Sequence, residues 1–402
     1  MSSLFRRSVG ITLRLAIAGA CGLGIWSSWQ FASADYSFQL DTAESVRSAM
    51  RLVPDSWEYP VRLAELDRAH ARELLETALR MNRYNAEADI ELGLQYEADG
   101  DFDRAEKQLL AAYDVDHTYL PRWSLANYYF RRDNMPAFWA WARKAAEMPA
   151  DDIGPLFELC WRVLPDAEKI SAAILNGKPE LLRQYLDFLI AKNQLKMVAE
   201  IAPRLVDAGD QEADRPLLFS IVNRFVAAND EDSANALWHL MIERHWVVAD
   251  ATAPNNGEFR RDPLPVSFDW TLPEYSGLHS WPGPSGLEVE FTGSQPEDCT
   301  IAEQTVALAP GNYTMAYSYH TSDIPPGTGI RWRIVDPNSN TVLADSPDLS
   351  SDVLNHAAIS LSVPPGASLL RLRLEYHRAL GTPRISGMLV VLSTQIQAVP
   401  KS

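Results

Sequence analysis

The feature that most constrains the fold is an abrupt change of pattern near residue 250. Residues 251–402 hold 16 of the 26 prolines and 11 of the 20 glycines in the 402-residue chain, which disfavours long helices there. Residues 41–246 instead repeat apolar side chains at helical spacing. The sequence therefore predicts two architectures in one chain, an α-helical part followed by a β part.

The helical part repeats with a period of about 34 residues. Tyr96 corresponds to Phe130 in the next unit, and Ala112 corresponds to Ala146. Together with the pair Leu92-Gly93, this spacing resembles the tetratricopeptide repeat. The resemblance implies helical hairpins that stack into a superhelix, with a protein partner in its groove.

The β part alternates apolar and polar residues with a period of two, which is typical of half-buried strands. The strands expected from this pattern are 287–291, 313–319, 330–335, 357–363, 369–376 and 385–392. Turn clusters such as Pro-Pro-Gly separate them, so we expect an antiparallel β-sandwich of the jelly-roll type.

These patterns predict four regions. They are an N-terminal signal peptide or membrane anchor (1–34), the helical superhelix (35–246), a linker (247–263) and the β-sandwich (264–398).

Parts of the β region resemble carbohydrate-binding modules and galactose-binding-like jelly rolls. The segments that carry this are Asn256-Gly257-Glu258-Phe259, Phe268-Asp269-Trp270 and the run from Gly381 to Gly387. In such modules a glutamate after the opening Asn-Gly helps to hold a structural calcium ion, which makes Glu258 the candidate ligand. Ser386 and Gly387 stand where a second acidic ligand would fall, and calcium takes about six to eight oxygens, so we expect no metal or cofactor.

The order of the regions resembles exported bacterial repeat proteins associated with exopolysaccharide or O-antigen assembly. The phrases that carry this are Tyr119-Leu120-Pro121-Arg122-Trp123, Phe157-x-Leu159-Cys160-Trp161 and Phe268-Asp269-Trp270. The resemblance implies a non-catalytic scaffold of the cell envelope, with a protein partner on the helices and glycan contact at the jelly roll.

The N-terminal segment predicts export. Arg6, Arg7 and Arg14 precede an uncharged, largely apolar run. Ala32-Ser33-Ala34 follows as a small-x-small cleavage signature. The densest apolar stretch is short, as in a signal peptide, whereas its tryptophans are typical of a membrane anchor. A cleaved signal and an anchor in the inner membrane both stay open, and either places the bulk of the chain in the periplasm.

Charge and motifs exclude several function classes. The chain has 36 Lys and Arg against 53 Asp and Glu, a net charge of -17, so we expect no nucleic-acid partner. His-Glu-x-x-His, Gly-x-Ser-x-Gly and phosphate-loop motifs are absent from the sequence. Glu288 and Glu290 are spaced for glycoside hydrolysis, but their alternation with apolar residues predicts a solvated strand face. We expect no enzyme; the alternative is a polysaccharide-modifying enzyme with an unrecognised active site.

The charged side chains that best suit ligand binding are four arginines on two expected strands. They are Arg331, Arg333, Arg371 and Arg373. If the strands are neighbours, their guanidiniums share one face and suit the carboxylates of an acidic polysaccharide. The structural alternative is ion pairing with Glu288, Glu290 or Glu375.

Aromatic residues between the Pro-Gly turns are candidate stacking platforms for sugar rings. They are Trp270, Tyr275 and Trp281. Trp332 is not a candidate, because its alternation with the arginines places it inside the sandwich.

Export is directly testable. Alkaline phosphatase is active only outside the cytoplasm, so we expect a fusion after Ser402 to be active in a bacterial host. A stably expressed but inactive fusion would show that the arginine-flanked segment does not direct export.

Overall fold

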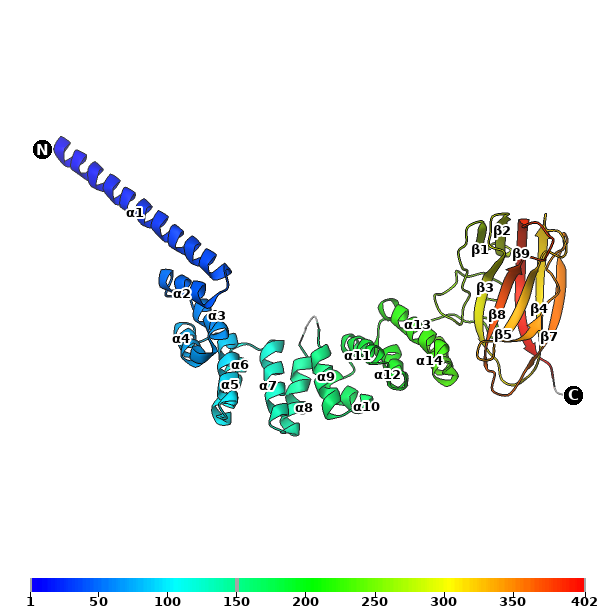
Figure 1. The fold of residues 1–402 in the computed structure, drawn as a ribbon, viewed down its shortest axis with the longest axis horizontal. Coiled ribbons are helices and arrows are strands. Elements are labelled where there is room, and N and C mark those ends of the chain that lie inside the picture. Colours follow the sequence, from blue (N-terminus) through cyan, green and yellow to red (C-terminus); the bar gives the residue numbers. More distant parts are fainter. Residues whose placement is uncertain (1, 149–151, 401–402) are drawn as a thin grey trace. The chain divides into compact units, whose positions relative to one another are not determined.

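The computed structural model describes residues 2–148 and 152–400, and the chain divides after Asn176 into two units. The first unit is helical, and the second combines four helices with the strands (Figure 1). The predicted fold class, helical hairpins followed by an antiparallel β-sandwich, is confirmed.

The helices are short apart from the first one. Those of the first unit are α1 (Ser2–Gln39), α2 (Ala43–Leu52), α3 (Glu58–Leu66), η1 (Arg68–His70), α4 (Ala71–Met81), α5 (Ala86–Ala98), α6 (Phe102–Val115), α7 (Tyr119–Arg131), α8 (Met135–Ala146), α9 (Gly154–Val163), α10 (Ala167–Ile170) and η2 (Ser171–Leu175). Those of the second unit are α11 (Pro179–Ala191), α12 (Leu195–Ala208), α13 (Gln211–Ala227) and α14 (Glu231–Glu243).

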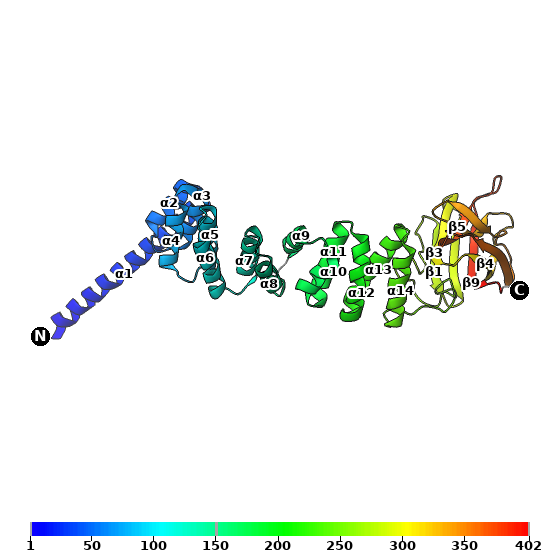
Figure 2. The same cartoon turned by 90° about the horizontal axis from the view of Figure 1, so that it is seen from below.

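The pairs α5/α6 and α7/α8 form the two hairpins with the strongest repeat signal, and their helices lie side by side in Figures 1 and 2. Asp101 and Asn134 begin the second helix of each hairpin, and each side chain accepts a backbone hydrogen bond three residues on. Gly93 lets α5 and α6 cross closely, because a Cβ there would lie 2.9 Å from a side-chain carbon of Leu109. Arg131 pairs with Glu97, one 34-residue period earlier.

Helix α1 ends within the fold of the first unit. Ala34 is fully buried and belongs to an apolar cluster with Val46, Ala49 and Tyr59. The side chains of residues 2–16, which include the three arginines of the export segment, lie outside the described part. No helix in the part of the chain that the structure describes is long and apolar enough to cross a membrane.

The sandwich consists of two antiparallel sheets. Its strands are β1 (Leu278–Gly283), β2 (Gly286–Thr292), β3 (Asp298–Ala307), β4 (Gly311–Ser322), β5 (Ile330–Asp336), β6 (Thr341–Asp345), β7 (Asn355–Val363), β8 (Leu369–His377) and β9 (Ser386–Ala398). One sheet has the order β1-β2-β9-β4-β7, and the other has the order β3-β8-β5-β6. The six strands predicted from alternation are present, while β1, β3 and β6 were not predicted.

The core lies between the two sheets. Trp332 on β5 is fully buried, as its alternation with the arginines predicted. Its ring centroid lies 5.9 Å from that of Trp270, which comes from the coil before β1. Both rings belong to the apolar cluster that fills the space between the sheets.

Residues 247–263, the predicted linker, are packed onto the sandwich. Phe259 is 1% exposed and stacks on Trp270. The carbonyl groups of Ala253 and Gly257 accept hydrogen bonds from the backbone of β9. Residues 253–257 therefore lie beside the C-terminal part of β9, which does not pair with β2.

The helices of the second unit contact the sandwich through Asn223 on α13. Its side chain accepts hydrogen bonds from the backbone and hydroxyl of Ser267 and donates one to the carbonyl oxygen of Pro265. Nearby, Trp238 packs against Phe268 with ring centroids 5.7 Å apart. Asn223 therefore fixes the segment that leads into Trp270.

Replacing Asn223 tests this junction. Asn223→Ala removes the hydrogen-bond partner of the Ser267 amide and hydroxyl, so we expect the free energy of unfolding of the second unit to fall by about 1–3 kcal/mol in urea denaturation. The matched control is Asn235→Ala on α14, whose side chain makes no hydrogen bond among the described residues. Equal effects of the two substitutions would contradict a role for Asn223.

Candidate functional site

The four arginines predicted as a ligand patch do lie together. Strands β5 and β8 are neighbours, and their register places Arg333 directly opposite Arg373. Each guanidinium is ion-paired. The pairs are Arg331 with Asp345 and Asp348, Arg333 with Asp345 and Glu375, Arg371 with Glu303, and Arg373 with Glu303 and Glu375.

This arginine face is a closed network of four cations and four carboxylates. Glu375 is one of the acids considered as a structural partner, whereas Glu288 and Glu290 lie on β2 in the other sheet. A glycan carboxylate would have to displace one of the protein's own carboxylates. The geometry therefore favours a structural role for these arginines.

Trp270 is not a stacking platform, which corrects the prediction. It is 1% exposed, and its indole nitrogen donates a hydrogen bond to the carbonyl oxygen of Asn256 at 3.0 Å. The carboxylate of Asp269 accepts hydrogen bonds from the backbone of Leu264 and Trp270 and so holds the turn that carries the ring inward. Burial raises the pKa of Asp269 despite these bonds.

Tyr275 and Trp281, the other two predicted platforms, line one groove of about 710 Å³ along the edge strand β1. We call it the aromatic groove. Its lining includes Leu272, Glu274, Tyr275, His279, Ser280 and Trp281. Trp281 is 37% exposed, so its ring is accessible to a ligand.

A tight turn positions the two aromatic residues. The amide of Leu278 donates a hydrogen bond to the carbonyl oxygen of Tyr275. Gly277 between them has φ +77°, and a Cβ there would lie 2.2 Å from the hydroxyl of Ser294. Only glycine fits this position, so the turn that joins the groove wall to β1 is fixed by sequence.

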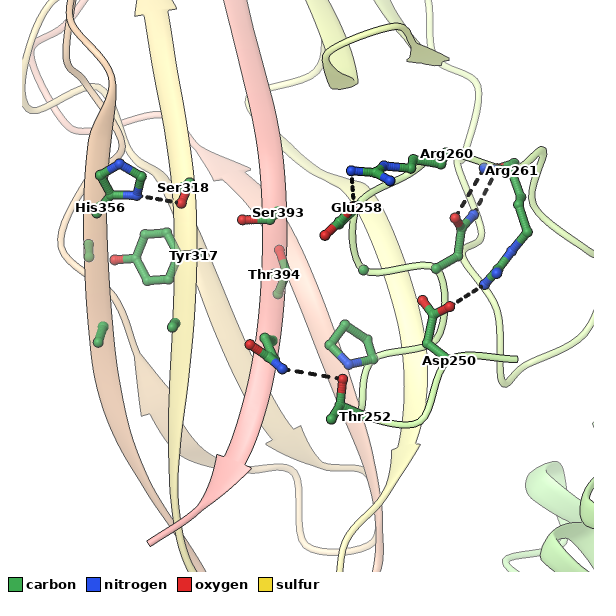
Figure 3. Close-up of a pocket in the computed structure, with 17 residues that line it drawn as sticks. Asp250, Thr252, Glu258, Arg260, Arg261, Tyr317, Ser318, His356, Ser393 and Thr394 are labelled. Atoms are coloured by element: carbon green, nitrogen blue, oxygen red, sulfur yellow. Dashed lines mark hydrogen bonds and ion pairs between the residues drawn. The ribbon is translucent and has the colours of Figure 1, made fainter. Parts of the chain in front are cut away.

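A second hollow, of about 740 Å³, lies over β9, β4 and β7 and is walled by residues 250–261 (Figure 3). We call it the polar trough. Glu258 and Arg260 face the strands from the wall, and Ser318, Ser393 and His356 lie on the strand side. The sequence did not predict this trough, because its wall is the segment interpreted as a linker.

The polar trough lacks a convergent acid and base. The hydroxyl of Ser318 lies 2.8 Å from Nδ1 of His356, but among the described residues no acid contacts the other ring nitrogen. Both carboxylates of the wall are ion-paired, Asp250 with Arg261 and Glu258 with Arg260. The trough therefore offers hydrogen-bonding groups rather than a catalytic constellation.

Glu258, the candidate calcium ligand, has an arginine as its partner at 2.6 Å. No group of three or more His, Cys, Asp or Glu side chains suited to a metal ion occurs in residues 17–148 and 152–400. Within those residues Glu258 is thus not part of a cluster of such side chains.

The helices carry a separate cluster of aromatic and cationic side chains on α6, α7 and α8. The rings of Tyr113 and Trp141 meet edge to face at 4.8 Å. Lys144 lies over Trp141 at 3.9 Å and Arg122 over Tyr113 at 5.7 Å. Neither cation has an ion-pair partner among the described residues, although the chain has an excess of acids. We call this the cationic cluster.

Comparisons with known proteins give similarity only to solved structures. No protein-family model and no curated protein matches the sequence. A tetratricopeptide-repeat protein of Thermus thermophilus is 19% identical, with 39% of this chain and 96% of that chain covered and a TM-score of 0.30. A CBM4 module is 13% identical, with 37% and 100% covered and a TM-score of 0.31.

A third solved structure is the carbohydrate-binding module of a lichenase from Cellvibrio mixtus, in complex with cellotriose. It is 10% identical, with 32% of this chain and 91% of that chain covered and a TM-score of 0.21. The fold of this chain is established by its own helices and strands.

The role of the arginine face is testable by the double substitution Arg331→Ala/Arg333→Ala. It leaves Asp345 and Asp348 without a cation, so we expect the free energy of unfolding of the second unit to fall by about 1–3 kcal/mol in urea denaturation. Arg384→Ala, which removes one longer and more exposed ion pair, is the control and should change little.

The same variant tests the acidic-glycan prediction. A double variant that keeps its stability but loses affinity for a uronate polymer, with an effect that shrinks as salt rises, would contradict the structural role. It would restore the arginines as a ligand site.

Proposed function

We propose that the protein is a non-catalytic scaffold of the cell envelope, which binds a protein partner through its helical hairpins and a glycan through its β-sandwich. The observation that carries this proposal is the aromatic groove, where Trp281 exposes its ring beside Tyr275 on the surface of the sandwich. Sugar rings present C–H faces that pack on such aromatic surfaces.

Two features of the sandwich surface support a glycan rather than an apolar ligand. Half-buried and exposed polar groups, Glu274, His279 and Ser280, surround the two rings. The polar trough on the same sheet adds hydroxyl, amide and imidazole groups (Figure 3). Polyhydroxylated ligands need this mixture of stacking surfaces and hydrogen-bonding groups.

The cationic cluster supports a protein partner on the helices. Arg122 is held by a hydrogen bond from its guanidinium to the carbonyl oxygen of Lys144 at 2.7 Å. Two cations that lack carboxylate partners among the described residues, placed over aromatic rings, form a surface that suits an acidic segment of another protein.

The alternative function is a polysaccharide-modifying enzyme. The ion-paired carboxylates of the polar trough and the incomplete Ser318–His356 pair argue against it. Burial raises the pKa of the Cys160 thiol to about 12 and that of Cys299 to about 11, so neither is a nucleophile at neutral pH. Appearance of new reducing ends or released acyl groups from a polysaccharide would support the enzyme instead.

Export and a role in extracellular polysaccharide assembly are part of the proposal. The arginine-flanked apolar segment supports export. Burial of Ala34 in the first unit supports retention of the N-terminal segment, since cleavage after Ala34 would remove that residue from its apolar cluster.

Trp281 provides the test of glycan binding. We expect the full chain to bind an oligosaccharide in a panel of neutral, acidic and amino-containing glycans, and Trp281→Ala to weaken that binding about tenfold or more, measured by calorimetry. Trp281→Phe should retain most of the affinity because it keeps an aromatic face.

The matched control is Tyr84→Ala, which removes an exposed aromatic ring from the helical part. No binding to any member of the panel, or equal loss in both alanine variants, would contradict the proposed function.

A further inference from the structure

The surroundings of the aromatic groove are acidic. On the outer face of the five-stranded sheet, the register of β1 and β2 places Glu288 directly opposite Trp281 and Glu290 directly opposite His279. Directly opposed side chains on antiparallel strands lie about 5 Å apart at Cβ. Glu274 lines the groove itself. Glu274 therefore lies in the groove lining, and Glu288 and Glu290 lie on the neighbouring strand on the same face as Trp281.

These three carboxylates have no cationic partner in the described part of the chain. None of them takes part in an ion pair or hydrogen bond there, and the groove lining contains no Lys or Arg. Elsewhere in this region, Asp250, Glu258, Glu303 and Glu375 pair with arginines. The three carboxylates are thus not paired with a lysine or an arginine, and His279 is the basic side chain of the groove lining.

Ser280 provides a further polar group that lacks a partner. Its hydroxyl oxygen is buried in the groove lining and makes no hydrogen bond with any described residue. Buried polar atoms are nearly always hydrogen-bonded in folded proteins. Ser280 lies opposite the fully buried Val289 in the strand register, so this hydroxyl faces the inner side of β1.

The charge of the whole chain acts in the same direction. A net charge of -17 repels a uronate polymer and attracts a polycation at distances up to about 10 Å in 0.1 M salt. The arginines that favoured an acidic glycan are neutralised by their own carboxylates. Neither the local nor the overall field therefore suits an acidic ligand.

We propose that the aromatic groove binds a polysaccharide that carries protonated amino groups, such as a de-N-acetylated hexosamine polymer. The inference rests on the proposed glycan binding and specifies its chemical class. A sugar ring packs on Trp281 and Tyr275, while its ammonium group lies among Glu274, Glu288 and Glu290. Ammonium and carboxylate groups form charge-assisted hydrogen bonds, which are stronger than those to neutral sugar hydroxyls.

The test compares oligosaccharides of equal length that differ only in acetylation. We expect a glucosamine hexamer to bind the full chain about tenfold more tightly than the N-acetylglucosamine hexamer at pH 6 and low salt, with the advantage shrinking as salt rises. A hexamer of uronic acid should bind more weakly than both.

Substitutions then assign the charge effect to the groove. Glu288→Gln/Glu290→Gln should reduce the preference for the glucosamine hexamer to about twofold or less, chiefly through weaker binding of that hexamer. Asp103→Asn/Asp114→Asn removes the same charge from α6 and should leave the preference intact. An equal reduction by both double variants would show a non-specific attraction and overturn the inference.

The outcomes separate the two levels of the proposal. Equal binding of the two hexosamine hexamers, with loss of both in Trp281→Ala, would overturn the amino-sugar inference and leave glycan binding standing. Tighter binding of the uronate hexamer would overturn it as well. No binding of any hexamer would contradict the proposed function itself.

Discussion

The packing of large aromatic rings between the two sheets is the constraint on which the second unit depends. Face-to-face sheets lie about 10 Å apart, and side chains from both must fill that space. Here one of the largest rings, Trp270, comes from coil outside the strands and packs against Trp332. Because Phe259 packs against Trp270 in turn, the segment before β1 is tied to the core along much of its length. This packing fixes the position of residues 250–261, which form the wall of the polar trough, and of the residues after Trp270, which line the aromatic groove.

The same constraint decides which aromatic side chains face solvent. Trp332 is on an inner strand and Trp270 follows a turn held by Asp269, so both point inward. Trp281 lies on β1, the edge strand of the five-stranded sheet, on the face that points away from the core. An exposed tryptophan at an edge lacks the neighbours that cover aromatic residues elsewhere, and it remains free to contact a ligand.

Alternation and helical spacing predicted much of the fold, because they report which face of an element is buried. The strands with clean alternation, such as the one that carries Arg331 and Arg333, are present as predicted. Strand β1 was missed because its run Trp281-Pro282-Gly283 reads as a turn, and β3 because both of its faces are largely buried. Alternation in the sequence predicted that the four arginines share one face. It could not predict the ion pair of Arg331 with Asp348, because Asp348 lies in an irregular segment that has no periodic pattern.

The arginine network gives the two broad faces of the sandwich different electrostatic characters. Its four guanidiniums and four carboxylates cancel within a few ångströms, so that face produces little field at a distance. The edge around Trp281 retains its negative charge. The charge of the sandwich is therefore unevenly distributed between its two sheets. For a cationic polymer, such an uneven charge distribution would favour approach to the sheet that carries the groove over approach to the arginine network.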